Sequence, residues 1–222
     1  MRNRATALIA VAVLVCLVPA ASQAQLVEYS QDFESMIQTD TGALAADGWL
    51  VFGNVYSPEL VFLYPYGPFP APNDGFGFCQ IDLLQGGDEQ GIQQLSVFSD
   101  YNNVDHAVGN LIESNTFQEW TVGPDDVGYI WSFEFQAKRG NLEGGSTAIA
   151  FIKTLDQANG YALTNFITAD MTAIPTTWSG DSLAITIDAS LEGQLLQIGF
   201  SNTATNYDGS GIFYDNIHFH IM

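Results

Sequence analysis

The chain has 222 residues and is strongly acidic, with 25 Asp and Glu against 5 Lys and Arg and a formal net charge of −20. Such a surface repels nucleic acid and anionic lipid, which excludes both as partners. Aromatic residues make up 13% of the chain, and this argues for a folded domain because disordered acidic chains are poor in aromatics. The acidic surface can serve either to keep the protein soluble in salty water or to collect divalent cations. We expect most of the carboxylates to serve solubility.

The first 24 residues have the order of a secretory signal peptide, in which two arginines precede an apolar run and then small residues. We expect cleavage after Ala24 and export to the periplasm or the extracellular space, with no membrane insertion afterwards. Cleavage would leave 3 basic against 25 acidic residues, a net charge of −22. Residues 25–222 then suit one all-β domain, and Cys79 alone remains, so no intramolecular disulfide is expected.

The densest run of turn-forming residues extends from Pro65 to Gly77 and predicts one long surface loop. Aromatic rings there offer flat faces to sugar rings, and prolines limit the entropy lost on binding. We therefore predict a ligand-binding surface at Tyr64, Tyr66 and Phe69. The alternative is that these rings fold back over one sheet as a lid on the core.

Four later segments alternate apolar and polar residues with a period of two, which predicts strands. In one of them, Phe151 and Lys153 share a face opposite small apolar residues. Turn-forming residues separate the segments, and helix is expected only as short turns around 41–46 and 169–173. This pattern predicts an all-β protein, an antiparallel β-sandwich of jelly-roll topology. The four segments are 129–137, 148–153, 183–188 and 196–201.

The last predicted strand carries a carboxylate within an apolar row. Strict alternation puts Asp215 on one face with Phe213, Ile217, Phe219 and Ile221, and that face is expected to be the core. An ionised carboxylate there is costly to desolvate unless a cation or several hydrogen-bond donors compensate it. The carboxylate of Asp215 is therefore predicted to contact either a cation or several hydrogen-bond donors.

His218 and His220 lie on one face of the same strand, at a spacing that suits a transition metal. Two exposed strand histidines without any site are the alternative, because short motifs of this kind often match by chance.

Several short motifs invite comparison with a known family. In chain order they are Asp32-Phe33-Glu34-Ser35, Gly48-Trp49, the central run 132–138, and the C-terminal runs 193–200 and 213–217. Together they resemble the galactose-binding-like jelly rolls, which include carbohydrate-binding modules and the cleaved-adhesin or anchor-associated domains of secreted bacterial proteins. The resemblance spans nearly all of residues 25–222.

In these domains a calcium ion often ties the first strand to the last, through a glutamate after the early Phe and an aspartate in the final strand. The resemblance therefore implies Glu34 and Asp215 as calcium ligands, with Asp32 as a weaker candidate. Calcium is coordinated by carboxylate and carbonyl oxygens in flexible geometry. An ion bound to both ends of the domain would close the longest possible loop of the chain, which should stabilise the fold. The alternative is that backbone amides or tyrosine hydroxyls donate hydrogen bonds to Asp215.

Catalysis has little support in the sequence, which has no Gly-x-Ser-x-Gly elbow, His-Glu-x-x-His motif or phosphate-binding glycine loop. We expect a secreted, non-catalytic binding or adhesion module that recognises extracellular glycan, with a structural calcium ion. Its partners would be an extracellular polysaccharide or a cell-surface protein. A structural protein of the extracellular matrix or cell envelope is the alternative, and a polysaccharide-active enzyme is the third possibility.

Overall fold

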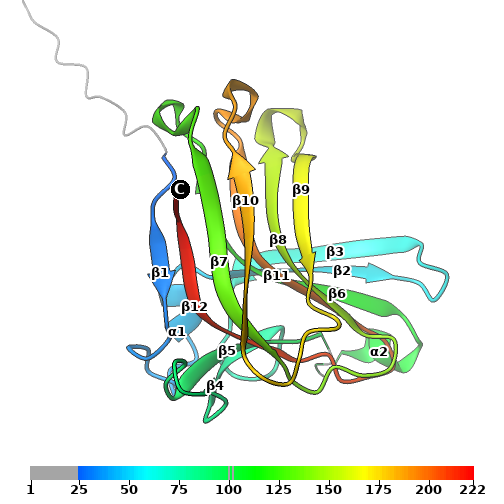
Figure 1. Cartoon of the computed structure of the whole chain (residues 1–222). Helices are drawn as coiled ribbons and strands as arrows, with labels where there is room; N and C mark the ends of the chain where they lie inside the picture. The colour runs from blue at the N-terminus through cyan, green and yellow to red at the C-terminus, as the bar shows by residue number, and fades with distance from the viewer. Residues whose placement is uncertain (1–24, 100, 102) are drawn as a thin grey trace, which may run out of the picture.

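The computed structural model describes residues 25–99, 101 and 103–222. The predicted signal peptide, 1–24, lies outside the described residues. The chain folds as an all-β protein in which two antiparallel sheets of six strands each pack as a jelly-roll sandwich (Figure 1). The predicted fold class is confirmed.

The first sheet, sheet A, contains both ends of the described chain. Its order is β10-β7-β12-β5-β4, and β1 pairs with the free part of β12 (Figure 1). Its strands are β1 (Tyr29–Gln31), β4 (Cys79–Leu83), β5 (Gln93–Val97), β7 (Ile130–Arg139), β10 (Ser179–Thr186) and β12 (Ile212–Ile221).

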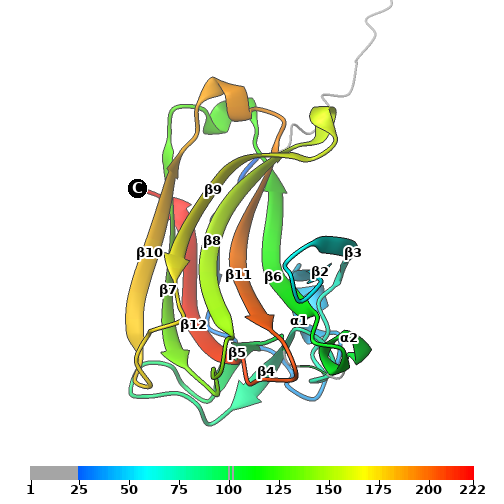
Figure 2. The ribbon, with the colours of Figure 1, turned by 90° about the vertical axis from the view of Figure 1, so that its right-hand side faces the viewer.

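The second sheet, sheet B, has the order β3-β2-β6-β11-β8-β9. Figure 2 shows β6, β11, β8 and β9 curving side by side across one face of the molecule. Its strands are β2 (Leu50–Tyr56), β3 (Phe62–Pro70), β6 (Leu111–Thr121), β8 (Thr147–Asp156), β9 (Ala162–Asp170) and β11 (Leu195–Ala204).

Helix is confined to single turns. The turn predicted at 41–46 is confirmed, but the one predicted at 169–173 is wrong, because β9 continues to Asp170 and pairs there with Ile149. Among the described residues, no helix is long and apolar enough to cross a membrane. The turns are α1 (Ala43–Ala46), α2 (Val104–Ala107) and three 3-10 turns at Pro124–Asp126, Gln157–Asn159 and Ala189–Leu191.

The core lies between the two sheets, where their inward side chains meet. Phe133 and Phe135 of β7 contact Phe200 of β11, with ring centroids 5.5 and 5.3 Å apart. Tyr214 of β12 stacks on the same Phe200 at 3.5 Å. β7 buries Phe133, Phe135 and Ala137 against the more exposed Glu134 and Gln136, as the period-two pattern predicted, whereas β11 is buried along nearly its whole length.

The segment predicted as a surface loop from Pro65 to Gly77 begins instead as a strand. β3 pairs with β2 along Phe62–Pro70 and forms an edge of sheet B. Prolines are tolerated on an edge strand because an amide on the outer side needs no partner strand. A proline-rich run therefore does not exclude a strand at this position.

The predicted face of Asp215 is also wrong. Asp215 pairs with Gln136, and the register shifts before His218 because Asn216 bulges out with φ +46°. The extra residue lets both Tyr214 and Ile217 face the core, so Asp215 lies on the outer face of sheet A. It is nevertheless fully buried, because the loop before β5 covers it.

Candidate functional site

The three predicted calcium ligands lie near one another, at the edge of sheet A where β1 leaves the sheet. Glu34 Oε1 accepts hydrogen bonds from the backbone N–H groups of Ile92 (2.7 Å) and Gln93 (2.6 Å). A Cβ at Gly91 would lie 2.6 Å from the Glu34 carboxylate, so the loop backbone wraps closely around it. Asp32 accepts a hydrogen bond from the Glu34 N–H at 3.1 Å.

Asp215 is the least compensated of the three. Asp215 Oδ1 accepts a hydrogen bond from the Asn216 N–H at 2.6 Å, whereas Oδ2 is buried with no hydrogen-bond partner in the part of the chain that the structure describes. Burial raises the pKa of Asp215 to about 7, hydrogen bonds to the carboxylate oppose this, and the charges of Glu34 and Asp32 add to it. N–H donors of Asn216 and Gln94 act on this carboxylate, but among the described residues it has no ion-pair partner.

These residues fit a calcium ion in charge and ligand type. An orphaned carboxylate oxygen beside two further carboxylates suits a hard divalent cation. Among the described residues, no group of three or more His, Cys, Asp or Glu side chains is arranged to hold a metal. Backbone carbonyls of the surrounding loops would have to complete the ligand set.

The predicted sugar-binding aromatics lie on β3, apart from the carboxylates. Tyr64 is 44% exposed and donates a hydrogen bond to Asp105, and Phe69 is 53% exposed. Tyr66 is packed more deeply: its ring stacks on Phe78 at 5.6 Å and its hydroxyl shares a hydrogen bond with Tyr101. Of the three, Tyr64 and Phe69 offer rings to solvent.

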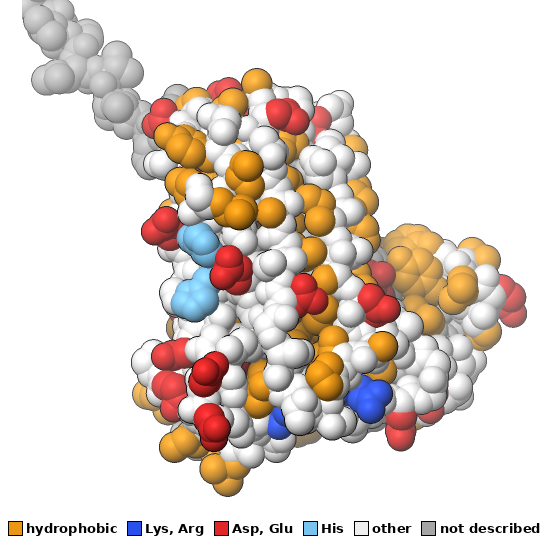
Figure 3. Space-filling model, in the orientation of Figure 1, with side chains coloured by type: hydrophobic (Ala, Val, Ile, Leu, Met, Phe, Trp, Pro, Cys, Tyr) orange, Lys and Arg blue, Asp and Glu red, His pale blue; other side chains and the backbone are white. Residues whose placement is uncertain are grey.

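The two histidines lie on the outer face of sheet A, where Figure 3 shows pale-blue side chains beside red ones. His218 Nδ1 is 3.0 Å from Ser30 Oγ, and His220 Nε2 is 3.7 Å from Glu134 Oε1. Both contacts are with strands on either side of β12, at positions set by the register.

A groove that the sequence did not reveal crosses the outer face of sheet B, the face seen in Figure 2. Its volume is about 630 Å³, and it extends from Pro68 of β3 to Tyr161, just before β9. With neighbouring strands roughly 4.8 Å apart, the four intervals from β3 to β8 span roughly 19 Å. We call it the sheet B groove. An elongated ligand would lie across the strands.

A polar row crosses the middle of the sheet B groove. Gln197 of β11 pairs in register with Glu119 of β6 on one side and Lys153 of β8 on the other. Directly paired residues share a face, so these three side chains lie in line. Gln197 Nε2 donates a hydrogen bond to Glu119 Oε2 at 2.5 Å, whereas Gln197 Oε1 is buried and no described residue donates a hydrogen bond to it.

Apolar rows flank this polar row on both sides. One contains Leu195 and Leu155, and the other contains Phe117, Gly199 and Phe151. A Cβ at Gly199 would lie 2.3 Å from the Thr116 carbonyl oxygen, so only glycine fits at this position. No side chain therefore rises from the sheet between the two phenylalanines. The groove thus combines apolar surface with a line of hydrogen-bonding groups.

Lys153 carries the one positive charge among the described residues that line the groove. Its Nζ lies 4.6 Å from the ring centroid of Phe151 and 5.5 Å from that of Phe117. Burial lowers the pKa of Lys153 to about 8, and the charges of Glu113 and Glu119 oppose this. No carboxylate of the described residues lies within 4.0 Å of it, so its ammonium donors are left for a ligand.

Sequence reasoning missed the groove because its rows form only through strand register, which joins residues far apart in the chain. One signal was available. Lys153 is one of three basic residues after position 24, and the strand pattern already placed it beside Phe151 on the face opposite Ala150.

No protein-family model and no curated protein sequence matches the chain. Several solved structures are similar in fold. The Stig cyclase Fisc from Fischerella sp. TAU has a TM-score of 0.50 and 12% identity, and the match covers 88% of this chain and 98% of that one. A protein described as a CBM4 module has a TM-score of 0.43 and 13% identity, over 86% of this chain and 97% of that one.

The enzymatically active domain of bacteriophage CBA120 tailspike protein 4 has a TM-score of 0.48 and 12% identity. The match covers 84% of this chain but only 22% of the tailspike chain. At 12% identity the likeness to the cyclase concerns the fold alone, and function has to be argued from the chain's own residues.

Proposed function

We propose that the protein is a secreted, non-catalytic module that holds an extracellular glycan in the sheet B groove. The observation that carries this proposal is the polar row of Glu119, Gln197 and Lys153, bounded by apolar rows on both sides. Two of its groups, Gln197 Oε1 and the Lys153 ammonium, lack hydrogen-bond partners in the described protein.

A saccharide suits this surface because each of its hydroxyls both donates and accepts hydrogen bonds. Glu119 and Gln197 offer acceptors, and Lys153 offers donors, within one line across the sheet. The C–H face of a sugar ring can pack on the partly exposed Leu155 and Leu195 and on Tyr161, which is 61% exposed at one end of the groove.

A hydrolase is less well supported. Glycosidases commonly use two carboxyl groups about 5–9.5 Å apart. The described lining of the groove holds one carboxylate, Glu119. Glu113 lies on the same strand six residues away, which is roughly 20 Å along an extended chain. We therefore infer binding without turnover.

A structural or adhesive protein of the matrix or envelope is the second candidate. It is favoured by β3 and the turn before it, where Leu60, Val61, Phe62 and Leu63 expose large apolar side chains. Figure 3 shows hydrophobic surface gathered on this projecting part of the molecule. Concentration-dependent oligomers in light scattering, without affinity for any glycan, would favour this candidate and its cell-surface protein partners.

We also propose a structural calcium ion held by Glu34 and Asp215, with Asp32 beside them. The support is the unpartnered Asp215 Oδ2 and the close wrapping of the loop at Gly91 around the Glu34 carboxylate. When bound, the ion would neutralise these charges and tie the start of the domain to its last strand.

A glycan array followed by titration calorimetry of any hit tests the function and separates two surfaces. If the sheet B groove binds the glycan, Tyr161→Ala weakens affinity several-fold, because a stacked ring is worth roughly 0.5–1.5 kcal/mol. Tyr64→Ala is the matched control, since it removes another exposed tyrosine, from β3.

If Tyr64→Ala weakens glycan affinity more than Tyr161→Ala does, the glycan binds instead at Tyr64, Tyr66 and Phe69, the surface expected from the sequence. If the wild-type protein binds no glycan on the array, the glycan-binding proposal is wrong for both surfaces.

A further inference from the structure

A second concave site lies on the outer face of sheet A, on the opposite side of the sandwich from the sheet B groove. Its volume is about 740 Å³. It is lined by Lys138 and Arg139, two of the three basic residues in the described chain. Figure 3 shows blue side chains at the lower end of this face. We call it the sheet A pocket.

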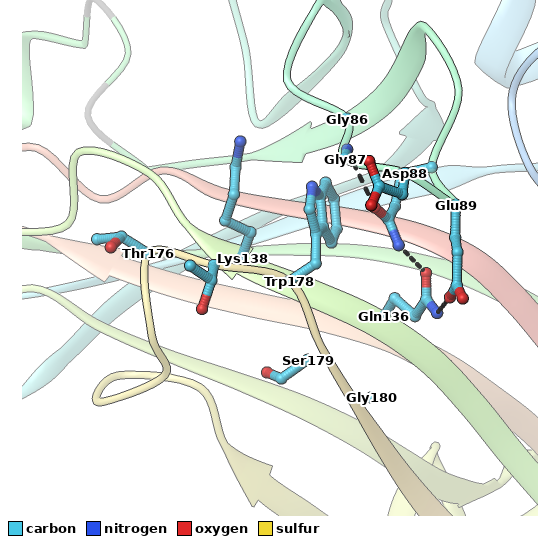
Figure 4. Close-up of a pocket in the computed structure, with 12 residues that line it drawn as sticks. Gly86, Gly87, Asp88, Glu89, Gln136, Lys138, Thr176, Trp178, Ser179 and Gly180 are labelled. Atoms are coloured by element: carbon cyan, nitrogen blue, oxygen red, sulfur yellow. Dashed lines mark hydrogen bonds between the residues drawn. The ribbon is translucent and has the colours of Figure 1, made fainter.

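Among the described residues, no carboxylate forms an ion pair with Lys138. Its Nζ lies 5.2 Å from the ring centroid of Phe213 and 5.5 Å from that of Trp178, and it donates a hydrogen bond to the Gln85 carbonyl. Burial lowers the pKa of Lys138, and no neighbouring carboxylate opposes this. In Figure 4, Trp178 stands between Lys138 and the acidic pair Asp88 and Glu89.

Arg139 is exposed at the rim of the same pocket. Its guanidinium has no hydrogen bond and no carboxylate within 4.0 Å among the described residues. The described lining of the pocket contains one carboxylate, Asp82, whose pKa is raised by burial. Two cations therefore face one acid in a chain with a net charge of −20. The local excess of positive charge favours an anionic ligand.

The floor of the pocket suits a sugar ring. Phe213 pairs in register with Lys138 on one side and Ser96 on the other, and Ser96 pairs with Gln80. The half-buried Phe213 ring is thus bordered by a hydroxyl, an amide and an ammonium, all on one face of the sheet. An apolar platform with hydrogen-bonding edges is the arrangement that binds a pyranose.

We propose that the sheet A pocket binds an acidic saccharide, with its carboxylate or sulfate ester on Arg139 and Lys138 and its ring on Phe213. Arg can receive either anion through two parallel N–H donors. This site is separate from the sheet B groove, so the module would hold two saccharides on opposite outer faces and could bridge two polymer chains.

Titration calorimetry with three probes tests the proposal, at one fixed calcium concentration and about 0.15 M salt. The probes are the galacturonic acid trisaccharide, a 6-sulfated galactose disaccharide and the neutral galactose trisaccharide. We expect at least one acidic probe to bind more tightly than the neutral one. Arg139→Gln should weaken that binding roughly tenfold or more, because charge-assisted hydrogen bonds are lost.

The matched control is Lys153→Gln, which removes the same charge from the other sheet. It should leave acidic binding unchanged, whereas any glycan bound in the sheet B groove should be lost in this variant and kept in Arg139→Gln. Arg139 is chosen over Lys138 because Lys138 also anchors Gln85. The proposal is wrong if neither acidic probe binds, if the neutral probe binds equally well, or if both variants weaken acidic binding alike.

Discussion

Calcium is expected to raise the midpoint of thermal unfolding of the wild-type protein by roughly 5–10 °C, and Asp215→Asn is expected to abolish this response. A ligand at 100 times its Kd adds about 2.7 kcal/mol to stability, and each kcal/mol shifts the midpoint of a domain this size by roughly 2–4 °C. The response depends on Asp215 because its buried Oδ2 has no hydrogen-bond partner among the described residues.

Differential scanning calorimetry with added calcium and with chelator measures the effect. The control is Asp181→Asn, which makes the same change at an exposed position of sheet A and should keep the full response. In chelator, Asp215→Asn should melt no lower than wild type, because it removes a desolvated charge.

Two results would contradict the calcium site. One is a wild-type midpoint that does not change between calcium and chelator. The other is an Asp215→Asn protein that melts lower in chelator, which would mean that hydrogen-bond donors alone hold the carboxylate in place.

Local periodicity was enough to predict the sandwich. Phe133 and Phe135 alternate with polar residues over a whole strand, and only a half-buried sheet gives such a row a stable environment. The burial of Asp215 was also predicted, although on the other face of the strand, and the partner expected for its carboxylate stays a prediction.

The face of Asp215 was not predictable, because a single bulged residue, Asn216, reverses the alternation for the rest of the strand. β3 was missed for a different reason. Pro65 and Pro68 are turn-forming by local preference, and only the edge position of the strand makes them compatible with pairing. Both errors concern properties of the sheet rather than of the segment.

The sheet B groove shows the same limit for function. Glu119, Gln197 and Lys153 become neighbours only when β6, β11 and β8 align in one register. Each residue alone looks like an ordinary surface position. The aromatics of β3 are conspicuous in the sequence because they are close together along the chain, and proximity in the chain is a poor guide to a site built across strands.

Lys153 provides the sharpest test of whether the sheet B groove was shaped for a ligand. Burial disfavours its charged form, because no carboxylate of the described residues lies within 4.0 Å and the attraction of two phenylalanine rings does not replace the lost hydration. Lys153→Met keeps the apolar contacts of the side chain and removes the charge. We expect the variant to be more stable by on the order of 1–3 kcal/mol, because the lowered pKa measures the cost of the buried charge.

The same variant should lose glycan affinity by roughly tenfold or more, since hydrogen bonds from a charged donor are worth about 1.5–3 kcal/mol. Lys138→Met is the matched control: it removes a lysine that also lies over aromatic rings, but on the other sheet, and should keep affinity for the glycan of the groove.

The pH dependence distinguishes a binding residue from a packing residue. The pKa of Lys153 is lowered from 10.5 to about 8 in the folded protein, so the cost of its charge is complete below pH 8 and disappears as the pH rises to about 10.5. The stability advantage of Lys153→Met should therefore be largest below pH 8 and vanish above about 10.5. Wild-type glycan affinity should fall as the pH rises through about 8, because the ammonium loses its proton, whereas the weaker affinity of the variant should not change with pH.

A Lys153→Met variant that is less stable than wild type and binds glycan equally well would show that Lys153 serves packing, and that the groove is not the glycan site.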